Sequence, residues 1–303
     1  MLASKAHQTI FFRILLFLTG VFLMVHLFSK VDFPQVWLSL KKLSPLTIFG
    51  IAVTYFISRI FQGLRFHSIL PAGLSIKRHI GLCLVNQTGN IFLPLRVGEL
   101  FRPLLMKIWV PQLSVQSIVA SSTLEKFVEA IAFLPFVYVA FGLLKNQAGF
   151  GHLDYIRYIE WGALVLLVLI VGIIFFRRQY FLEKFREFLL LKRSVLVLFY
   201  GILAWATYAT SYYFLLKQWD LAFAVAIVVI FSSSISGLPA GLGVFESSYV
   251  WVAKLGGFST EDALAGALLC HAIQISIILA SGLSCLWTWG WPRSQDWKLF
   301  NAG

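Results

Sequence analysis

Charged residues are scarce in this sequence. Asp, Glu, Lys and Arg make up 13% of the 303 residues, hydrophobic residues make up 59%, and the mean hydropathy is +0.83. A soluble domain carries about 25% charged residues, and no stretch here is polar for long enough to form one. Because a membrane crossing takes about 20 apolar residues, the composition predicts an all-α polytopic membrane protein with a single integral membrane domain over residues 1–303.

Cysteines and catalytic motifs are also sparse. Cys83, Cys270 and Cys285 stand far apart in apolar segments and fit no metal-ligand spacing, so we expect small buried residues there. The sequence has no Walker motif, no nucleophile motif and no His-Glu-x-x-His zinc signature. We therefore expect no ATP hydrolysis by this chain, no metal and no cofactor.

The charges that are present are mostly basic, with 25 Lys and Arg against 13 Asp and Glu. In so apolar a chain, the net charge of +12 suits cytoplasmic loops and an anionic membrane surface rather than nucleic acid. The side of the membrane whose loops collect the larger share of this charge is predicted to be cytoplasmic. This predicts a multi-pass cell-membrane protein with both termini in the cytoplasm. The residues expected on that side are Lys5, Lys77, Arg78, the cluster 177–193, Arg293 and Lys298.

Apolar runs divide the chain into about eight hydrophobic segments, with a short amphipathic helix expected at the interface over 30–43. Segments long enough to cross the membrane are expected over 10–28, 46–70, 114–144, 158–176, 194–216 and 262–291. Shorter apolar segments, which cannot cross alone, cover 80–85 with a second part around Leu93, 221–231 and 244–255.

Two polar stretches interrupt the apolar runs. The first, 86–102, contains two Asn, a Gln, two Gly, a Pro, two Arg and a Glu. The second, 232–246, has a similar order: a polar lead-in, Leu-Pro, then Gly and Glu. Pro94, Gly98 and Pro239 are expected to break helices, and in a bilayer the freed backbone groups must be satisfied by protein or water. Each stretch therefore predicts a re-entrant or broken helix pair.

The two stretches are part of a longer internal similarity. An offset of about 145 residues superimposes Pro94 on Pro239 and the flanking crossings on one another, which defines half-repeats 1–145 and 146–303. If each broken element enters and leaves on one side, each half crosses three times and the second half is inverted. Inverted repeats of this kind are typical of transporters, with the site at the repeat interface. The alternative is a set of eight independent crossings without re-entrance.

Basic side chains at membrane depth are the first candidates for a binding site. An Arg fork binds phosphate oxygens bidentately and stays charged when buried. An Arg at a helix centre costs about 2.5–3.5 kcal/mol on insertion scales, so Arg59 needs a partner, whereas Arg65 can extend to the interface. The alternative is that Arg59 or Arg65 pairs with Glu125 or Glu129 and only locks the bundle. The candidates are Arg59, Arg65, Arg96 and Arg102, with Asn86 and Asn90 as neutral hydrogen-bonding groups and Glu125 and Glu129 as acids.

Other candidates flank the breaks. Glu99 and Glu246 are expected at helix N-termini, where an acid either complements the helix dipole or serves ion coupling or contact with a cationic headgroup. Gly241 and Gly243 either form a backbone anion nest or allow close packing. His271 is either a pH-sensitive group or a satisfied interior histidine.

These residues resemble a known family, the flippase-like membrane domain of lysylphosphatidylglycerol synthases and its stand-alone relatives. The resemblance covers nearly the whole chain, and the ordered pair Pro-x-Arg-x-Gly-Glu and Pro-x-Gly-x-Gly-x-x-Glu is fairly specific. The chain departs from the family at 125–129, where the family often has Glu-Arg-x-x-Asp, and at His271, where it often has Arg. The similar features are Arg65, Asn90, the run 93–102, the cluster Glu125-Lys126-x-x-Glu129, and the run 238–246.

The resemblance implies a lipid flippase without enzymatic activity. It would move an anionic or aminoacylated phospholipid, or another phosphate-bearing lipid, between leaflets. The sequence contains no soluble aminoacyl-transferase half, so we do not expect it to make lysyl-lipid. Membrane phospholipids are the expected partners and a lipid-synthesis enzyme is a further candidate, while the oligomeric state is left open.

Two other function classes stay open. One is an accessory or structural partner of a lipid- or envelope-synthesis enzyme, which would not need four Arg residues at or near membrane depth. The other is an intramembrane lipid-linked transferase, which would need a carboxylate pair on a loop near the membrane surface that the sequence does not offer.

Overall fold

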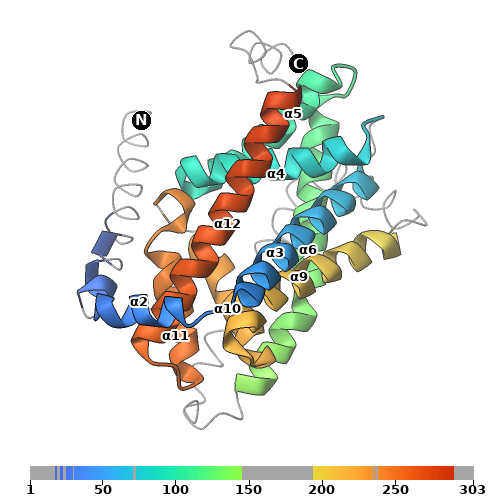
Figure 1. Cartoon of the computed structure of the whole chain (residues 1–303). Helices are drawn as coiled ribbons and strands as arrows, with labels where there is room; N and C mark the ends of the chain where they lie inside the picture. Colours follow the sequence, from blue (N-terminus) through green and yellow to red (C-terminus); the bar gives the residue numbers. More distant parts are fainter. Residues whose placement is uncertain are drawn as a thin grey trace, which may run out of the picture.

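The computed structural model describes residues 18, 21–22, 25–29, 31–70, 73–144, 194–234, 236 and 238–289, and within them every regular element is a helix. The all-α prediction is therefore confirmed (Figure 1). The elements are α2 (Phe33–Lys41), α3 (Pro45–Ile69), α4 (Ile76–Phe92), η1 (Pro94–Leu100), α5 (Phe101–Trp109), α6 (Val115–Leu144), α9 (Ser194–Leu216), α10 (Trp219–Ser234), η2 (Pro239–Gly241), α11 (Val244–Leu255) and α12 (Thr260–Trp289). The predicted crossing 158–176, the basic cluster 177–193, both termini and most of the crossing 10–28 lie outside the described residues.

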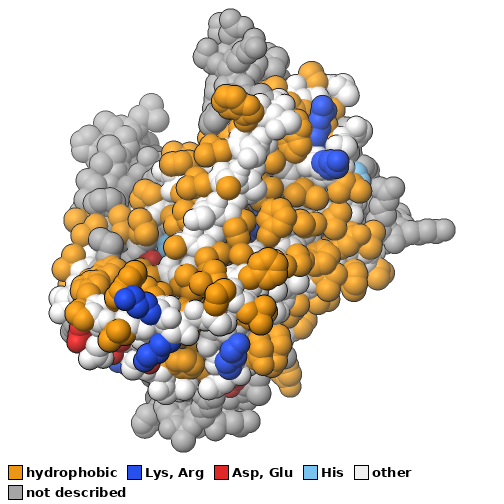
Figure 2. All heavy atoms as spheres, viewed as in Figure 1, with side chains coloured by type: hydrophobic (Ala, Val, Ile, Leu, Met, Phe, Trp, Pro, Cys, Tyr) orange, Lys and Arg blue, Asp and Glu red, His pale blue; other side chains and the backbone are white. Residues whose placement is uncertain are grey.

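The described surface is that of a multi-pass membrane protein. Among the described residues, α3, α9 and α12 are long and apolar enough to cross a membrane. Large apolar side chains on these helices are exposed, with 65% of Phe49, 52% of Phe199 and 86% of Trp287 accessible. Exposed apolar surface of this extent marks contact with lipid or protein. Figure 2 shows hydrophobic side chains over most of one face, with the exposed Lys and Arg near its two ends.

The long helices α3 and α9 pack against each other in opposite directions. Gly50, near the start of α3, faces the ring of Phe214, near the end of α9. Arg65, near the end of α3, faces Gly201, near the start of α9. α12 instead runs parallel to α3. The start of α12 bonds to α2, the helix that precedes α3 in the chain, and the end of α12 reaches α5. The two contacts that show this are Ser39 Oγ to Asp262 Oδ1 at 2.6 Å and the rings of Trp109 and Trp289 at 5.7 Å.

Two helical hairpins enter this bundle from opposite sides (Figure 1). The first, α4–η1–α5, lies between the end of α3 and the start of α6, and residues of all four α-helices share one buried apolar cluster. The second, α10–η2–α11, lies between the end of α9 and the start of α12. Because α3 and α9 are antiparallel, the second hairpin enters from the side opposite to the first. The two broken helix pairs and their entry from opposite sides agree with the prediction, whereas their re-entrance in a membrane and the half-repeats 1–145 and 146–303 stay predictions.

Each hairpin turns at a Leu-Pro break. Pro94 opens η1 and Pro239 opens η2, both at the first position of the turn, where a missing N–H costs nothing. Gly98 contributes in another way, because it lies directly on the backbone of Gly89 and Asn90. A Cβ at Gly98 would come within 2.5 Å of the Gly89 carbonyl carbon. Gly98 therefore lets η1 fold back on α4.

The α3–α4 contact generates a stability prediction. A Cβ at Gly63 would lie 2.5 Å from Ile80 Cα, a backbone atom that no rotamer change can move. Overpacking costs about 1–3 kcal/mol, against a gain of about 1 kcal/mol for Ala over Gly in a helix. Gly63→Ala should therefore lower the melting temperature of the purified protein in detergent. Ala272→Val, which adds two carbons on an exposed face of α12, should leave it nearly unchanged; equal melting of both variants would contradict this packing.

Candidate functional site

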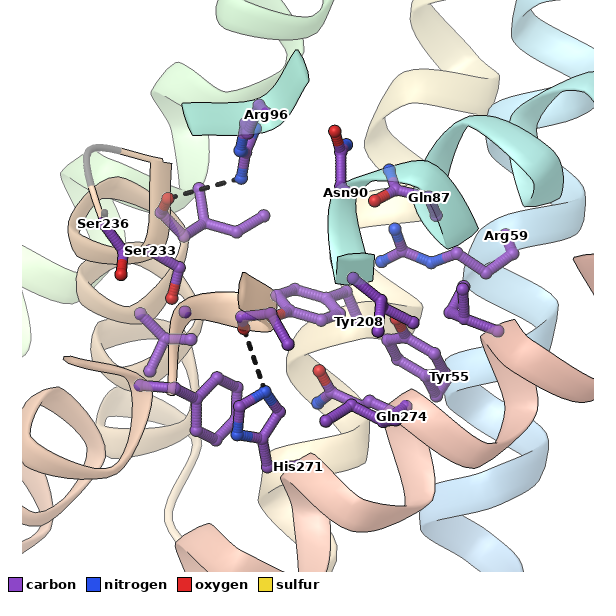
Figure 3. A pocket seen from close by; sticks show the side chains of 18 of the residues that line it. Tyr55, Arg59, Gln87, Asn90, Arg96, Tyr208, Ser233, Ser236, His271 and Gln274 are labelled. Atoms are coloured by element: carbon purple, nitrogen blue, oxygen red, sulfur yellow. Dashed lines mark hydrogen bonds between the residues drawn. The ribbon is translucent and has the colours of Figure 1, made fainter. Parts of the chain in front are cut away.

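The tips of the two hairpins face one cavity of about 130 Å³. Figure 3 shows its polar side chains converging from both halves of the chain. The repeat pattern predicted a site where the halves meet, and the cavity lies there. Its polar lining consists of Tyr55, Arg59 and Gln62 on α3, Gln87 and Asn90 on α4, Arg96 on η1, Lys126 and Glu129 on α6, Tyr208 on α9, Ser233 on α10, Ser236 before η2, and His271 and Gln274 on α12.

Two of the four candidate arginines are held by carboxylates and do not line this cavity. Arg65 Nη2 donates to Glu125 Oε1 at 2.8 Å and lies 3.2 Å from Glu129 Oε1, with both Arg65 and Glu125 only 1% exposed. Arg102 pairs with the other oxygen of Glu125 and stacks on Phe66, 4.7 Å from the ring centroid. One buried network thus joins α3, α5 and α6. The expectation that Arg65 extends to the interface is wrong, because two acids hold it inside.

The network continues toward the cavity through weaker, more exposed contacts. Lys126 Nζ lies 3.3 Å from Glu129 Oε2 and 3.4 Å from Glu99 Oε1, and Asn90 Nδ2 donates to the same Glu99 oxygen at 3.4 Å. Glu99 lies inside η1 rather than in the first turn of an α-helix, and its charge serves this pairing. Three cations and three anions cancel, as burial requires. They are Arg65, Arg102 and Lys126 against Glu99, Glu125 and Glu129.

Arg59 and Arg96 line the cavity, and no described carboxylate pairs with either. Arg59 is 5% exposed, and its Nη1 donates to Gln62 Oε1 at 3.2 Å. Its guanidinium carbon lies over the rings of Tyr55 and Tyr208, 4.6 and 5.3 Å from their centroids. Aromatic faces attract the cation but leave its N–H groups free to donate. A buried cation without a counter-ion is costly, so an anion in the cavity would offset that cost.

The backbone is strained at both hairpin tips. Arg96 has a φ of +54° and Ala240 a φ of +55°, in the left-handed region that costs a non-glycine residue roughly 1–2 kcal/mol. At this position Arg96 reaches across to the second hairpin, where its Nη2 donates to the Ile230 carbonyl oxygen at 3.5 Å (Figure 3). Strain of this kind clusters at functional sites. Here it occurs at matching places in the two halves.

In the second half, Glu246 and His271 form a buried pair beside the tip. Glu246 Oε2 accepts from the Gly243 N–H at 2.7 Å, which closes the first turn of α11 as expected of an acid there. Its Oε1 lies 2.6 Å from His271 Nδ1, and His271 Nε2 lies 3.1 Å from the Ala240 carbonyl oxygen. The imidazole also stacks on Phe245 at 4.0 Å. His271 therefore joins α12 to the break of the second hairpin.

The glycines of the second tip do not offer a free anion nest. The N–H of Gly241 donates to the Leu238 carbonyl oxygen at 3.1 Å, and that of Gly243 donates to Glu246. Both residues have positive φ, +77° and +76°, which glycine adopts without strain. Close turning of the backbone, rather than anion binding, accounts for Gly241 and Gly243.

A local sequence pattern could indicate some of the remaining residues that line the cavity, but not all of them. Asn86 is fully buried within α4 and does not line the cavity, whereas Asn90, one turn later, does. The spacing of Tyr55, Arg59 and Gln62 places them on one face of α3 and could have indicated the cavity wall. Tyr208 lies on α9, and only the packing of α9 on α3 brings its ring to Arg59. Gln87, Lys126, Ser233 and Gln274 also line the cavity, and the sequence did not mark them as binding-site candidates.

The sequence matches a known family over most of its length. The model of the family described as the lysylphosphatidylglycerol synthase TM region matches residues 10–282. No curated protein was found to match the chain. The matched residues include both hairpins and every residue that lines the cavity.

The ion-pair network generates a second stability prediction. Glu125→Gln leaves Arg65 and Arg102 buried with too little negative charge, and breaking a buried pair costs about 3–5 kcal/mol. We expect a large loss of stability in thermal unfolding followed by tryptophan fluorescence in detergent. Glu99→Gln is the matched control, because Glu99 is 26% exposed and its contact with Lys126 is worth about 1 kcal/mol or less. Similar losses in both variants would refute the central role of Glu125.

Proposed function

Because the chain belongs to the lysylphosphatidylglycerol synthase TM-region family, a membrane family associated with flippase-like function, we propose that it moves a phosphate-bearing lipid between membrane leaflets. The observation that carries this proposal is the pair Arg59 and Arg96, two guanidiniums that face one cavity without a carboxylate partner among the described residues. Phosphate oxygens are the anionic group that the guanidinium fork binds best. The substrate is an anionic or aminoacylated phospholipid, or another lipid with a phosphate, and the protein acts as a carrier rather than an enzyme.

The charge of the lining fits this role. Lys126 and Glu129 lie 3.3 Å apart and cancel each other, which leaves Arg59 and Arg96 as the excess positive charge. The volume of about 130 Å³ suits a phosphate with part of its headgroup, not an acyl chain. Asn90 and Ser233 add neutral hydrogen-bonding atoms, since Asn90 Oδ1 and Ser233 Oγ have no hydrogen-bond partner within the described ranges. In this arrangement the headgroup crosses on polar groups while its tails stay in hydrocarbon.

The inverted hairpins give the headgroup a route to either side. Each hairpin enters from its own side and ends at the shared cavity, so displacement of one tip opens the cavity toward one leaflet. The Arg65–Glu125–Arg102 network ties the first hairpin to α3 and α6, and this half therefore moves as a unit. In this proposal the protein lies in the cell membrane with both termini in the cytoplasm. An enzyme that synthesises the lipid is a candidate partner.

The proposal predicts that transport depends on both cavity arginines. We expect Arg59→Gln and Arg96→Gln each to slow lipid transfer about tenfold or more, since a charged hydrogen bond contributes about 1.5–3 kcal/mol. The assay follows fluorescent anionic, zwitterionic and aminoacylated phospholipids in proteoliposomes, with an impermeant reductant bleaching the outer leaflet. Arg78→Gln is the matched control, because Arg78 is exposed near the start of α4 and should be dispensable.

Two other results of the transfer assay would contradict the proposal. Transfer by the two cavity variants at the wild-type rate would show that Arg59 and Arg96 do not hold the substrate. No transfer of any of the three lipid classes by the wild type would instead favour an accessory role beside a lipid-synthesis enzyme.

A further inference from the structure

The buried pair Glu246 and His271 contains two titratable groups that the phosphate site does not use. Their side chains are 3% and 7% exposed, and Glu246 Oε1 lies 2.6 Å from His271 Nδ1. His271 also lines the cavity, on the wall opposite Arg96 and near the tip of the second hairpin (Figure 3). A carboxyl and an imidazole this close and this buried share their protons as one unit.

His271 can form both of its hydrogen bonds only if the Glu246–His271 pair holds one proton more than a carboxylate and a neutral imidazole together. Nδ1 faces a carboxylate oxygen and Nε2 faces the Ala240 carbonyl oxygen, so both ring nitrogens face acceptors. A neutral imidazole donates from only one nitrogen, and the lone pair on the other would face an oxygen. Both bonds form together only when the pair holds one more proton, either on the imidazole or on Glu246. The two contact distances fit a pair that holds this proton.

The same bonds fasten the second hairpin. Ala240 belongs to η2, and its strained φ of +55° turns its carbonyl oxygen toward His271. Glu246 holds the next part of the turn through the Gly243 N–H. Loss of the proton turns one attractive contact into a contact between two lone pairs, which weakens the connection between α12 and η2. The protonation state of the pair therefore sets how firmly the tip is held.

The groups around the cavity determine how the pair responds to a phosphate. Of the charged groups that the structure describes around the cavity, Arg59 and Arg96 are the uncompensated cations, and their field opposes an added proton. Lys126 and Glu129 face the cavity from α6, and their charges cancel. The other titratable groups are neutral at physiological pH: Tyr55 on α3, Tyr208 and Tyr212 on α9, Tyr249 on α11 and Cys270 on α12; α4 contributes only the amides Gln87 and Asn90.

A chain of contacts also runs from Arg59 to α12, the helix that carries His271. Arg59 stacks on Tyr208, whose hydroxyl lies 2.6 Å from that of Tyr212. The Tyr212 hydroxyl accepts from Gln274 Nε2 at 3.1 Å, and Gln274 lies on α12 one turn after His271. A change at Arg59 or at Gln274 can thus affect the other residue through packed side chains.

We propose that Glu246 and His271 form a proton-binding site that is coupled to headgroup binding. The identity of the headgroup as a phosphate rests on the proposed function. An anion between Arg59 and Arg96 removes the repulsion that opposes the proton, so phosphate binding brings proton uptake. By linkage, the added proton strengthens phosphate binding by the same factor. Transfer of the lipid then responds to a proton gradient.

The test measures binding of a short-chain fluorescent phosphodiester lipid to the purified protein in detergent from about pH 5.5 to about pH 8.5, where histidine titrates. The single negative charge of a phosphodiester does not change in this range, so any pH dependence belongs to the protein. We expect wild-type affinity to fall about 5- to 150-fold as the pH rises. A pH indicator in weak buffer should also record proton uptake when the lipid is added.

Three variants separate the proton site from a structural role. Glu246→Gln and His271→Gln should flatten the pH dependence and abolish the proton uptake. His271→Arg keeps a fixed positive charge that can donate to both Glu246 and Ala240, so it should fold and bind equally at every pH. His26→Gln, at an exposed position, should behave like the wild type. Pronounced pH dependence in His271→Arg would overturn the proposal.

The other outcomes are also decisive. Wild-type binding that is independent of pH and takes up no proton would overturn the proton site and leave the proposed function intact. If the wild type binds no phosphate lipid at any pH, the proposed function fails. The proton site is then decided by ¹⁵N NMR of labelled histidine, with the His271 signal assigned by its loss in His271→Gln. An imidazole that stays neutral and does not titrate over the same range would refute it.

Discussion

The carboxylate of Glu125 is the interaction on which the rest of the site depends. Its two oxygens hold Arg65 of α3 and Arg102 of α5, and so join the first hairpin to two long helices. A buried guanidinium needs such an acid, yet in the part of the chain that the structure describes neither Arg59 nor Arg96 has a carboxylate partner. The four arginines thereby divide into two that stabilise the bundle and two that face the cavity.

The arginines divide in this way at the centre of the protein because both hairpins end there. Neither hairpin crosses the bundle, so both end in polar turns that must be satisfied inside it. At the first tip Arg96 reaches the Ile230 carbonyl oxygen of the second hairpin, and at the second tip Ala240 bonds to His271 of α12. Both contacts depend on backbone with positive φ. The first tip is therefore held by the second hairpin, and the second tip by α12.

The sequence allowed the helices to be predicted closely, because their signals are local. The runs 194–216 and 244–255 match α9 and α11, and the Leu-Pro breaks mark both hairpins. The partners of the arginines could not be predicted in this way. Arg59 and Arg65 are six residues apart, and at about 100° per residue their side chains leave different sides of α3. Which side meets Glu125 is decided by how α6 packs, and no local pattern encodes that packing.

The division of the arginines is tested most directly by a high-resolution structure of the protein in a lipid nanodisc with an anionic phospholipid. We expect phosphate density within hydrogen-bonding distance of both Arg59 and Arg96, while Arg65 and Arg102 stay bound to Glu125. Phosphate bound to Arg65 or Arg102 in place of Glu125, or a cavity without phosphate while lipids are ordered elsewhere, would contradict it.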